Sequence, residues 1–384
     1  MSMENNSTIE QSRNTPKGDA QSVPKGWVET TLGEVVKIYS GKTRPKENGI
    51  YPIYGGNGIL NYGNKYNQEN DTIIIGRVGA YCGNIFSEKN KFWLSDNALG
   101  VKNNSKSDVS YLYYKLIYLK LNNHSIGGAQ PLLTQGLLKK LEITIPKSIS
   151  EQKAIAQILT AFDDKIELLQ AQNKTLETTA QTIFKEWFGK YQIGDELPEG
   201  WRVGKIGTVV KIKQGKYVGS EKISEVKTGQ YKFPVFGGGG IRGYLSDYIY
   251  ETPQVILTCR GNGCGRIQLS ENYSTVTNSC MALEDENFIL NYKYIYLLTK
   301  TIDFESVTSG SAQPQITVTN LEGMEVIIPK ESKLVKFNEI VKPLFRKLSI
   351  NKIQIQALKK TRDTLLPKLM SGQLRVDEFK EGAI

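Results

Sequence analysis

With 384 residues, the chain is longer than one ordinary core and fits two globular units of about 130 residues joined by connecting segments. Its formal net charge of +10 favours a polyanionic partner, either nucleic acid or an anionic membrane surface. Four cysteines and a single histidine argue against a disulfide framework and against a zinc site.

Residues 1–23 are predicted to form a disordered N-terminal tail, because they are polar and lack the apolar stretch of a signal peptide. In the rest of the sequence, no apolar run approaches the ~20 residues that are needed to cross a bilayer. We therefore expect a cytoplasmic protein.

Residues 24–147 form a first predicted unit of mixed α and β structure. Short apolar runs punctuated by glycine, such as residues 72–75, are typical of strands. The aromatic residues of the segment 111–121 have helical spacing, and tyrosines in such a pattern more often pack in a core than form a base-stacking platform. The last predicted strand, residues 142–146, ends in proline.

A long helix is predicted over residues 148–190, with a capping box of Ser148 and Glu151 at its start. Apolar residues then recur in alternating steps of four and three, which is the heptad repeat of a coiled coil. The predicted seam of this helix includes Leu159, Ile166, Asn173, Leu176 and Ile183. Asp163 and Asp164 lie beside the seam and are predicted to face solvent.

Residues 198–330 repeat the first unit. Nine identities within residues 24–41 recur within residues 198–215 at an offset of 174, and after one insertion the offset becomes 182 or 183. An ordered series this long indicates a duplication, and the repeat is far too long for a solenoid. The sequence therefore predicts two related domains of the α+β class.

A second long helix is predicted over residues 332–371, followed by a C-terminal tail over residues 372–384. Its seam includes Val341, Leu348, Asn351, Leu358 and Leu365. A parallel pair would place Asn173 and Asn351 against aliphatic side chains at about 1–3 kcal/mol each, whereas an antiparallel pair brings the two amides together. Only one pair, Phe162 with Arg362, is then mismatched, and the guanidinium could turn outward or lie on the ring.

We therefore predict an intramolecular antiparallel coiled coil. Two helices of about 33 residues are about 50 Å long, so the pair would act as a spacer between the domains. A pseudo-twofold axis would then relate two similar but unequal DNA-reading surfaces, and the target need not be palindromic. In the alternative, each helix is simply amphipathic and packs on its own domain.

Catalytic motifs are missing from the sequence. Residues 40–43 resemble the end of a phosphate-binding loop, but Val36 stands where that loop needs glycine. The glycine-rich residues 237–243 are interpreted as a turn, since no dinucleotide-binding context surrounds them. We find no base-holding tetrapeptide of an amino-methyltransferase and no metalloprotease motif. A non-catalytic chain without a metal or cofactor of its own is expected.

Base recognition needs side chains with hydrogen-bond donors, chiefly Arg, Lys, Asn and Gln, on loops that a rigid scaffold holds. The glycine-rich connections of both units supply such residues. The DNA-binding candidates of the first unit are Lys42, Arg44, Lys46, Tyr54, Asn57 and Arg77. Those of the second unit are Lys216, Lys222, Arg242, Arg260, Asn262 and Arg266. In the alternative, the lysines are merely solvated, and Arg77 or Arg260 forms an internal salt bridge.

Four stretches give the chain a strong family resemblance: GWVETTLGEVVKIYSGKTRP, IIIGRVGAYCGNI, GAQPLLTQGLLKKLEITIPKSISEQKAIAQIL and LLPKLMSGQLRV. With them the chain resembles the specificity subunit of a type I restriction-modification system, over nearly all of residues 24–376. The resemblance implies two target recognition domains, each reading one part of a split DNA sequence, and helices that set the unread gap.

The resemblance also implies docking of two methyltransferase subunits and of motor-nuclease subunits, and these partners would carry S-adenosylmethionine, ATP and Mg²⁺. Two other classes stay open at this point. A two-headed adaptor that binds only proteins would use the same duplication and heptads, although the basic charge argues against it. A fused methyltransferase is the other, and the missing motifs argue against that.

Overall fold

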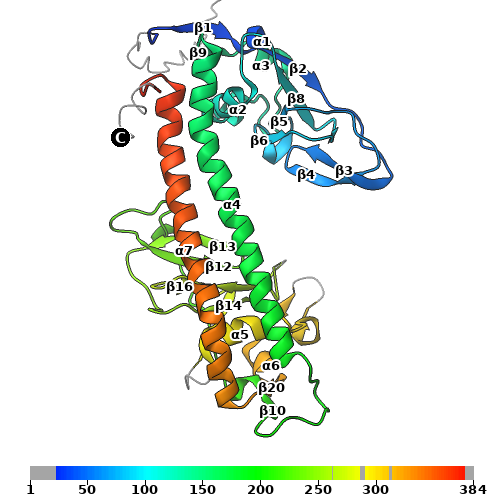
Figure 1. Ribbon diagram of the computed structural model, residues 1–384, viewed down its shortest axis with the longest axis vertical. Coiled ribbons are helices and arrows are strands. Elements are labelled where there is room, and N and C mark those ends of the chain that lie inside the picture. The colour runs from blue at the N-terminus through cyan, green and yellow to red at the C-terminus, as the bar shows by residue number, and fades with distance from the viewer. Residues whose placement is uncertain (1–22, 262, 286–289, 311–313, 377–384) are drawn as a thin grey trace, which may run out of the picture. The chain divides into compact units, whose positions relative to one another are not determined.

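The structure is a computed structural model that describes residues 23–261, 263–285, 290–310 and 314–376. Its contacts divide the chain into two compact units (Figure 1). Unit 1 comprises Met1–Glu167 and Gln356–Ile384, and unit 2 comprises Leu168–Ile355. Each unit therefore contains one copy of the duplicated domain together with a part of each long helix.

Unit 1 is built from three small sheets. Its strands are β1 (Trp27–Thr31), β2 (Val36–Ser40), β3 (Asn48–Gly55), β4 (Gly58–Gly63), β5 (Thr72–Gly76), β6 (Ile85–Glu88), β7 (Trp93–Leu94), β8 (Ala98–Asn103) and β9 (Glu142–Pro146). The sheet orders are β2-β8-β5-β6, β4-β3-β7 and β1-β9. All pairs are antiparallel except β3 with β7. The helices of the domain are α1 (Leu32–Val35), α2 (Val109–Tyr118) and α3 (Gln135–Lys139), with 3-10 turns η1 (Gly79–Tyr81) and η2 (Leu121–His124).

Strand β5 explains how these layers are joined. Its side chains alternate between the two faces of the sheet, so Ile73 and Ile75 enter the main core with α2, while Ile74 enters a smaller core beside β3. All three isoleucines are fully buried. Tyr111 of α2 is also fully buried, so the tyrosine-rich helix belongs to the core and is not a stacking platform.

Unit 2 repeats this design with one extra hairpin. Its strands are β10 (Arg202–Lys205), β11 (Lys211–Gln214), β12 (Phe233–Gly237), β13 (Gly240–Leu245), β14 (Val255–Thr258), β15 (Ile267–Leu269), β16 (Thr275–Val276), β17 (Cys280–Glu284), β18 (Thr308–Ser309), β19 (Gln315–Ile316) and β20 (Glu325–Ile328). The sheet orders are β11-β17-β14-β15, β13-β12-β16, β10-β20 and β18-β19. The helices are α5 (Asn291–Thr299) and α6 (Val318–Glu322), with η3 (Ile206–Thr208), η4 (Ser220–Lys222) and η5 (Glu305–Val307).

The duplication reaches down to irregular features. The β3–β4 hairpin shifts register between Ile53 and Tyr54, and the β12–β13 hairpin does so at the corresponding Val235 and Phe236. The predicted α+β class with a duplicated domain is confirmed.

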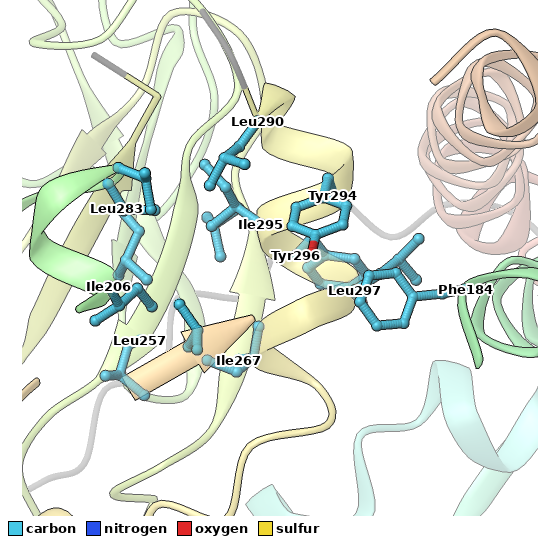
Figure 2. Packing of buried hydrophobic residues seen from close by; sticks show 14 of the residues in the cluster. Phe184, Ile206, Leu257, Ile267, Leu283, Leu290, Tyr294, Ile295, Tyr296 and Leu297 are labelled. Atoms are coloured by element: carbon cyan, nitrogen blue, oxygen red, sulfur yellow. The ribbon is translucent and has the colours of Figure 1, made fainter. Parts of the chain in front are cut away.

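The core of unit 2 is organised around α5. Figure 2 shows its side chains lying between the sheet, which contributes Leu257 and Leu283, and the long helix α4 (Ile149–Phe188), which contributes Phe184. The rings of Phe184 and Tyr294 lie 5.3 Å apart. A helix that packs on both sides needs apolar residues around most of its circumference, as α5 has.

The long helices α4 and α7 (Glu331–Met370) pair antiparallel within each unit. In unit 2 the Nδ2 of Asn351 donates to the Oδ1 of Asn173 at 3.0 Å, and the rings of Trp187 and Phe337 are 5.9 Å apart. In unit 1 the end of α7, at Leu369, packs in the same core as Leu159. These contacts match the antiparallel alignment, and each seam position of the predicted list is buried or half-buried.

Two details of the helix pair differ from expectation. Arg362 neither turns outward nor lies on a ring, because it forms an ion pair with Asp163. Asp163 is consequently half-buried, and it also accepts a hydrogen bond from Tyr114 Oη at 2.7 Å, so the prediction that it faces solvent is wrong. Phe184 of α4 also packs on α5 of the second domain, so α4 contributes to a domain core as well as to the helix pair. The alternative of two unpaired amphipathic helices is wrong, because α4 and α7 contact each other along the seam. Within the described residues, no helix is both long and apolar enough to span a membrane.

Candidate nucleic-acid interface

The connection from β2 to β3, and the equivalent one from β11 to β12, begins with a glycine that is packed tightly against the neighbouring backbone. A Cβ on Gly41 would lie 1.9 Å from the carbonyl oxygen of Ser95, and one on Gly215 would lie 2.2 Å from that of Thr277. The next residue is tied down through its backbone, because Lys42 N donates to Leu94 O and Lys216 N donates to Val276 O, both at 3.0 Å. The first residues of each connection are therefore held in place by the sheet.

Basic side chains extend into solvent from these connections. Lys42, Arg44 and Lys46 are exposed in unit 1, as are Lys216 and Lys222 in unit 2. Exposed cations on anchored loops can attract and orient a phosphate backbone without a large loss of conformational freedom. No structural feature of these five residues conflicts with a role in DNA binding, which stays a prediction for each of them.

Arg242 is exposed on β13, but its guanidinium already has partners. Its Nη2 donates to Ser220 Oγ at 2.7 Å, and its Nη1 donates to Val218 O at 3.5 Å. Arg242 therefore positions the loop between β11 and β12, in addition to any contact with DNA. Its counterpart in unit 1 is Leu60, which has no such hydrogen bonds to make.

The β3–β4 hairpin separates two of the predicted candidates. Asn57 is exposed at the tip, where Gly55 pairs with Gly58. Tyr54 is buried, its ring lies 5.4 Å from that of Phe92, and its Oη donates to Glu88 at 3.0 Å. Burial, together with Glu88, raises the pKa of Tyr54. The structure does not support the inclusion of Tyr54 among the base-reading residues, because its side chain fills the smaller core.

The arginines that follow β5 and β14 occupy different kinds of position. Arg77 is half-buried, and its Nε has no hydrogen-bond partner among the described residues. Arg260 is exposed, and its backbone bridges to Gln315. No ion pair of either arginine occurs among the residues that the structure describes. Arg266 is exposed as well, and Asn262 lies outside the described residues.

The sequence interpretation missed a residue that positions Lys42. The indole Nε1 of Trp93 donates to Lys42 O at 3.2 Å. Trp93 follows Lys42 by 51 residues in the sequence, and the parallel pairing of β3 with β7 and the bridge of Lys42 with Ser95 bring the two segments together. No local sequence signal predicts such a contact.

The cysteines of the two domains have structural roles. Cys82 is buried and its Sγ donates to Arg77 O at 3.2 Å, and burial raises its pKa. Burial also raises the pKa of Cys280, which is fully buried. Raised pKa values disfavour the thiolate, which is the nucleophilic and metal-binding form. In the described part of the chain, no group of three or more acidic, Cys or His side chains could hold a metal ion.

The start of α4 and the end of α7 are locked together in unit 1. The Nε1 of Trp27 donates to Glu151 Oε1 at 3.1 Å, and Nη2 of Arg375 lies 3.2 Å from the same oxygen. On the other side, Lys115 Nζ donates to Met370 O at 2.9 Å. Three stretches that are distant in sequence thus meet at one junction, which fixes the helix pair to the domain.

Comparison with known proteins gives a consistent result. The family described as type I restriction modification DNA specificity domain matches residues 24–178 and 198–360. The type I restriction enzyme MjaIX specificity subunit of Methanocaldococcus jannaschii is 32% identical over 302 residues, which cover 70% of each chain. A putative type I specificity subunit of Mycoplasma genitalium is 26% identical over 363 residues, covering 89% of this chain and 93% of the relative.

A solved structure supports the fold independently. The crystal structure of the type I restriction-modification system S subunit from M. genitalium superposes with a TM-score of 0.61. The match covers 93% of this chain and 99% of that chain at 23% sequence identity. The two chains therefore share their fold.

Proposed function

The chain belongs to the type I restriction modification DNA specificity family, and on that premise we propose that each of its domains reads one half of a split, asymmetric DNA sequence. It is a recognition chain and not a catalytic one, since the matched family is the DNA specificity domain. The duplication supports the proposal most directly. Two domains of the same topology carry different side chains at corresponding exposed positions, such as Thr43 and Tyr217, or Leu60 and Arg242.

We further propose that two methyltransferase subunits and the motor-nuclease subunits assemble on this chain in the cytoplasm. Those partners would supply S-adenosylmethionine, ATP and Mg²⁺. The long helices offer a docking surface, because five of their large hydrophobic side chains stand in solvent. These are Leu168, Val335, Ile340, Ile350 and Ile353. Exposed apolar side chains along a helix pair can be covered when another protein binds there.

The helix pair is proposed to set the length of the unread gap. Both α4 and α7 contribute residues to unit 1 and to unit 2, so a change in their length acts on the two domains together. Inserting one heptad in each helix, in register, adds about 10 Å, which is about three base pairs of duplex. Sequencing of methylated adenines in cells that carry this variant should show the same half-sites with a longer gap. An unchanged gap would contradict the spacer role.

A mobility-shift experiment separates this proposal from the adaptor alternative. The chain is mixed with random duplex, alone and together with the methyltransferase subunit, at two salt concentrations. A DNA-reading chain shifts the duplex, and the shift weakens steeply with salt because phosphate contacts release counterions. If neither mixture shifts the duplex, the chain is an adaptor and the proposal is wrong.

A further inference from the structure

One large apolar side chain in each domain stands almost completely in solvent. Ile50 of unit 1 is 79% exposed and Tyr217 of unit 2 is 81% exposed, the two highest values among the large hydrophobic residues that the structure describes. Both lie in the segment where the repeat offset changes from 174 to 182, Ile50 near the start of β3 and Tyr217 between β11 and β12. Single exposed hydrophobic residues are common, so the geometry that holds them is what matters.

Ile50 is presented by a bulge in β3. Asn48 and Tyr51 both face Gly63 of β4, so Gly49 and Ile50 are looped out of the ladder. A Cβ on Gly49 would lie 2.4 Å from the Cα of Asn64, which means that the bulge is closed tightly against the neighbouring strand.

The base of the bulge is also tied. The backbone of Asn64 donates to Glu47 O at 3.3 Å, and the side chain of Asn64 contacts the Glu47 carboxylate. Ile50 therefore projects from a fixed backbone.

Tyr217 is held in an equivalent way by different contacts. Lys216 on one side is anchored to Val276 through its backbone. Val218 on the other side accepts a hydrogen bond from Arg242, which also binds Ser220. The flanking residues of Tyr217 are thus fixed, while its side chain is 81% exposed.

The surroundings of both side chains favour a polyanion. Unit 1 has Lys42, Arg44 and Lys46 ahead of Ile50, and the single carboxylate there, Glu47, is engaged by Asn64. In unit 2 the corresponding segment carries exposed Lys216, Lys222, Lys227 and Lys232 against Glu221 and Glu225. An exposed apolar side chain among basic residues matches the surface of proteins that contact both the backbone and the bases of nucleic acid.

We propose that Ile50 and Tyr217 enter the base stack of the two half-sites, Ile50 as an aliphatic wedge and Tyr217 as a stacking ring. This inference rests on the proposed function and assigns to it two residues that read DNA without a hydrogen bond to a base edge. A wedge opens a base step most easily at flexible pyrimidine–purine steps, so it adds specificity through deformability. A ring stacks on any base and mainly adds affinity.

The test uses the complete complex with its methyltransferase subunits and a duplex that contains the recognised site. 2-Aminopurine is placed at one position at a time, and its fluorescence rises where stacking is lost. The wild-type complex should raise the signal at one step in each half-site. Ile50→Ala should remove only the fluorescence signal of the first half-site and weaken binding about tenfold. Ile50→Val should keep most of that signal and most of the binding affinity.

Tyr217→Ala should have the same effect on the second half-site alone, and Tyr217→Phe should behave as the wild type. Each variant is the control for the other, and unchanged thermal unfolding of all four shows that the fold is intact. If the complex binds its site and the alanine variants alter neither fluorescence nor affinity, the wedge inference is wrong and the proposed function stands. Weaker binding without any fluorescence signal in the wild type also contradicts insertion. A wild-type complex that does not prefer its site contradicts the proposed function itself.

Discussion

Burial decides the role of a residue in this chain more than its chemical type does. Lys42 and Lys115 are both lysines of unit 1, yet Lys42 is exposed on an anchored loop and Lys115 is buried with its Nζ on the carbonyl of Met370. Tyr54 and Tyr217 differ in the same way, since the first fills a core and the second meets solvent. Candidates for DNA contact must therefore be chosen by exposure and anchoring together.

Arg260 provides a test at this scale. It is exposed beside a bridge to Gln315, and its counterpart in unit 1 is Val78, so only unit 2 has this cation. Arg260→Ala should relax or abolish recognition of one half-site and leave the other unchanged, at a cost of about 1–3 kcal/mol for a lost bidentate base contact. Methylation patterns of cells with the variant measure this. The exposed Arg346 of α7, changed to Ala, serves as the control, and patterns intact at both halves would remove Arg260 from the interface.

Lys115 predicts a pH dependence of stability. Burial lowers the pKa of Lys115 from 10.5 to about 8. Between about pH 8 and pH 10.5, the side chain is therefore protonated in the unfolded chain and neutral in the folded chain. The free energy of unfolding should therefore rise as the pH rises from about 8 to 10.5, by about 1–3 kcal/mol. Chemical denaturation of wild type and Lys115→Met at pH 7.5 and pH 10 gives the difference. An equal response of both proteins would show that Lys115 does not contribute.

At the scale of elements, the heptad pattern predicted the pairing of the two long helices. The seam of α4 and α7 and its direction follow from two asparagines, because an amide that is buried without a partner is costly. The ion pair of Arg362 with Asp163 was not predicted, since it joins residues at and beside the seam. The pairing of the strands in the sheets could not be predicted. Strand segments could be located by their apolar runs, but nothing in the sequence shows that β3 pairs with both β4 and β7.

The same reason explains the error at Tyr54. A strand places alternate side chains on opposite faces, and the sequence of β3 does not say which face is covered. The loops could be located by their glycines, whereas their anchors, such as Trp93 and Arg242, come from other strands. Exposed recognition residues make few contacts within the chain, so few local constraints mark them.

The hydrogen-bonded asparagines of α4 and α7 should stabilise the helix pair. Asn351 is fully buried and donates to Asn173. Asn351→Leu alone should lower the free energy of unfolding by about 1–3 kcal/mol, because Asn173 then loses its partner. Replacing both asparagines by leucine should restore most of this loss. Urea denaturation of the two single variants and the double variant yields the coupling energy, and strictly additive losses would show that the amides act independently.

At the scale of the whole molecule, the chain uses one domain fold twice and carries different exposed side chains on the two copies. The orders of the four-stranded and three-stranded sheets correspond in the two domains, and so do a register shift in one hairpin and the glycine that follows β2 or β11. The side chains beyond that glycine differ between the domains. The expected consequence is a scaffold that tolerates new half-sites without a change in its core.

Exchange of a domain tests this account most directly. In the variant, residues 198–330 are replaced by a second copy of residues 24–147, and methylated adenines are located across the genome by single-molecule sequencing. The wild-type chain should yield an asymmetric bipartite motif. The variant should yield a motif whose two halves are the same sequence in inverted orientation. If the variant complex methylates DNA at the unchanged wild-type motif, the two domains do not read separate halves and the account is wrong.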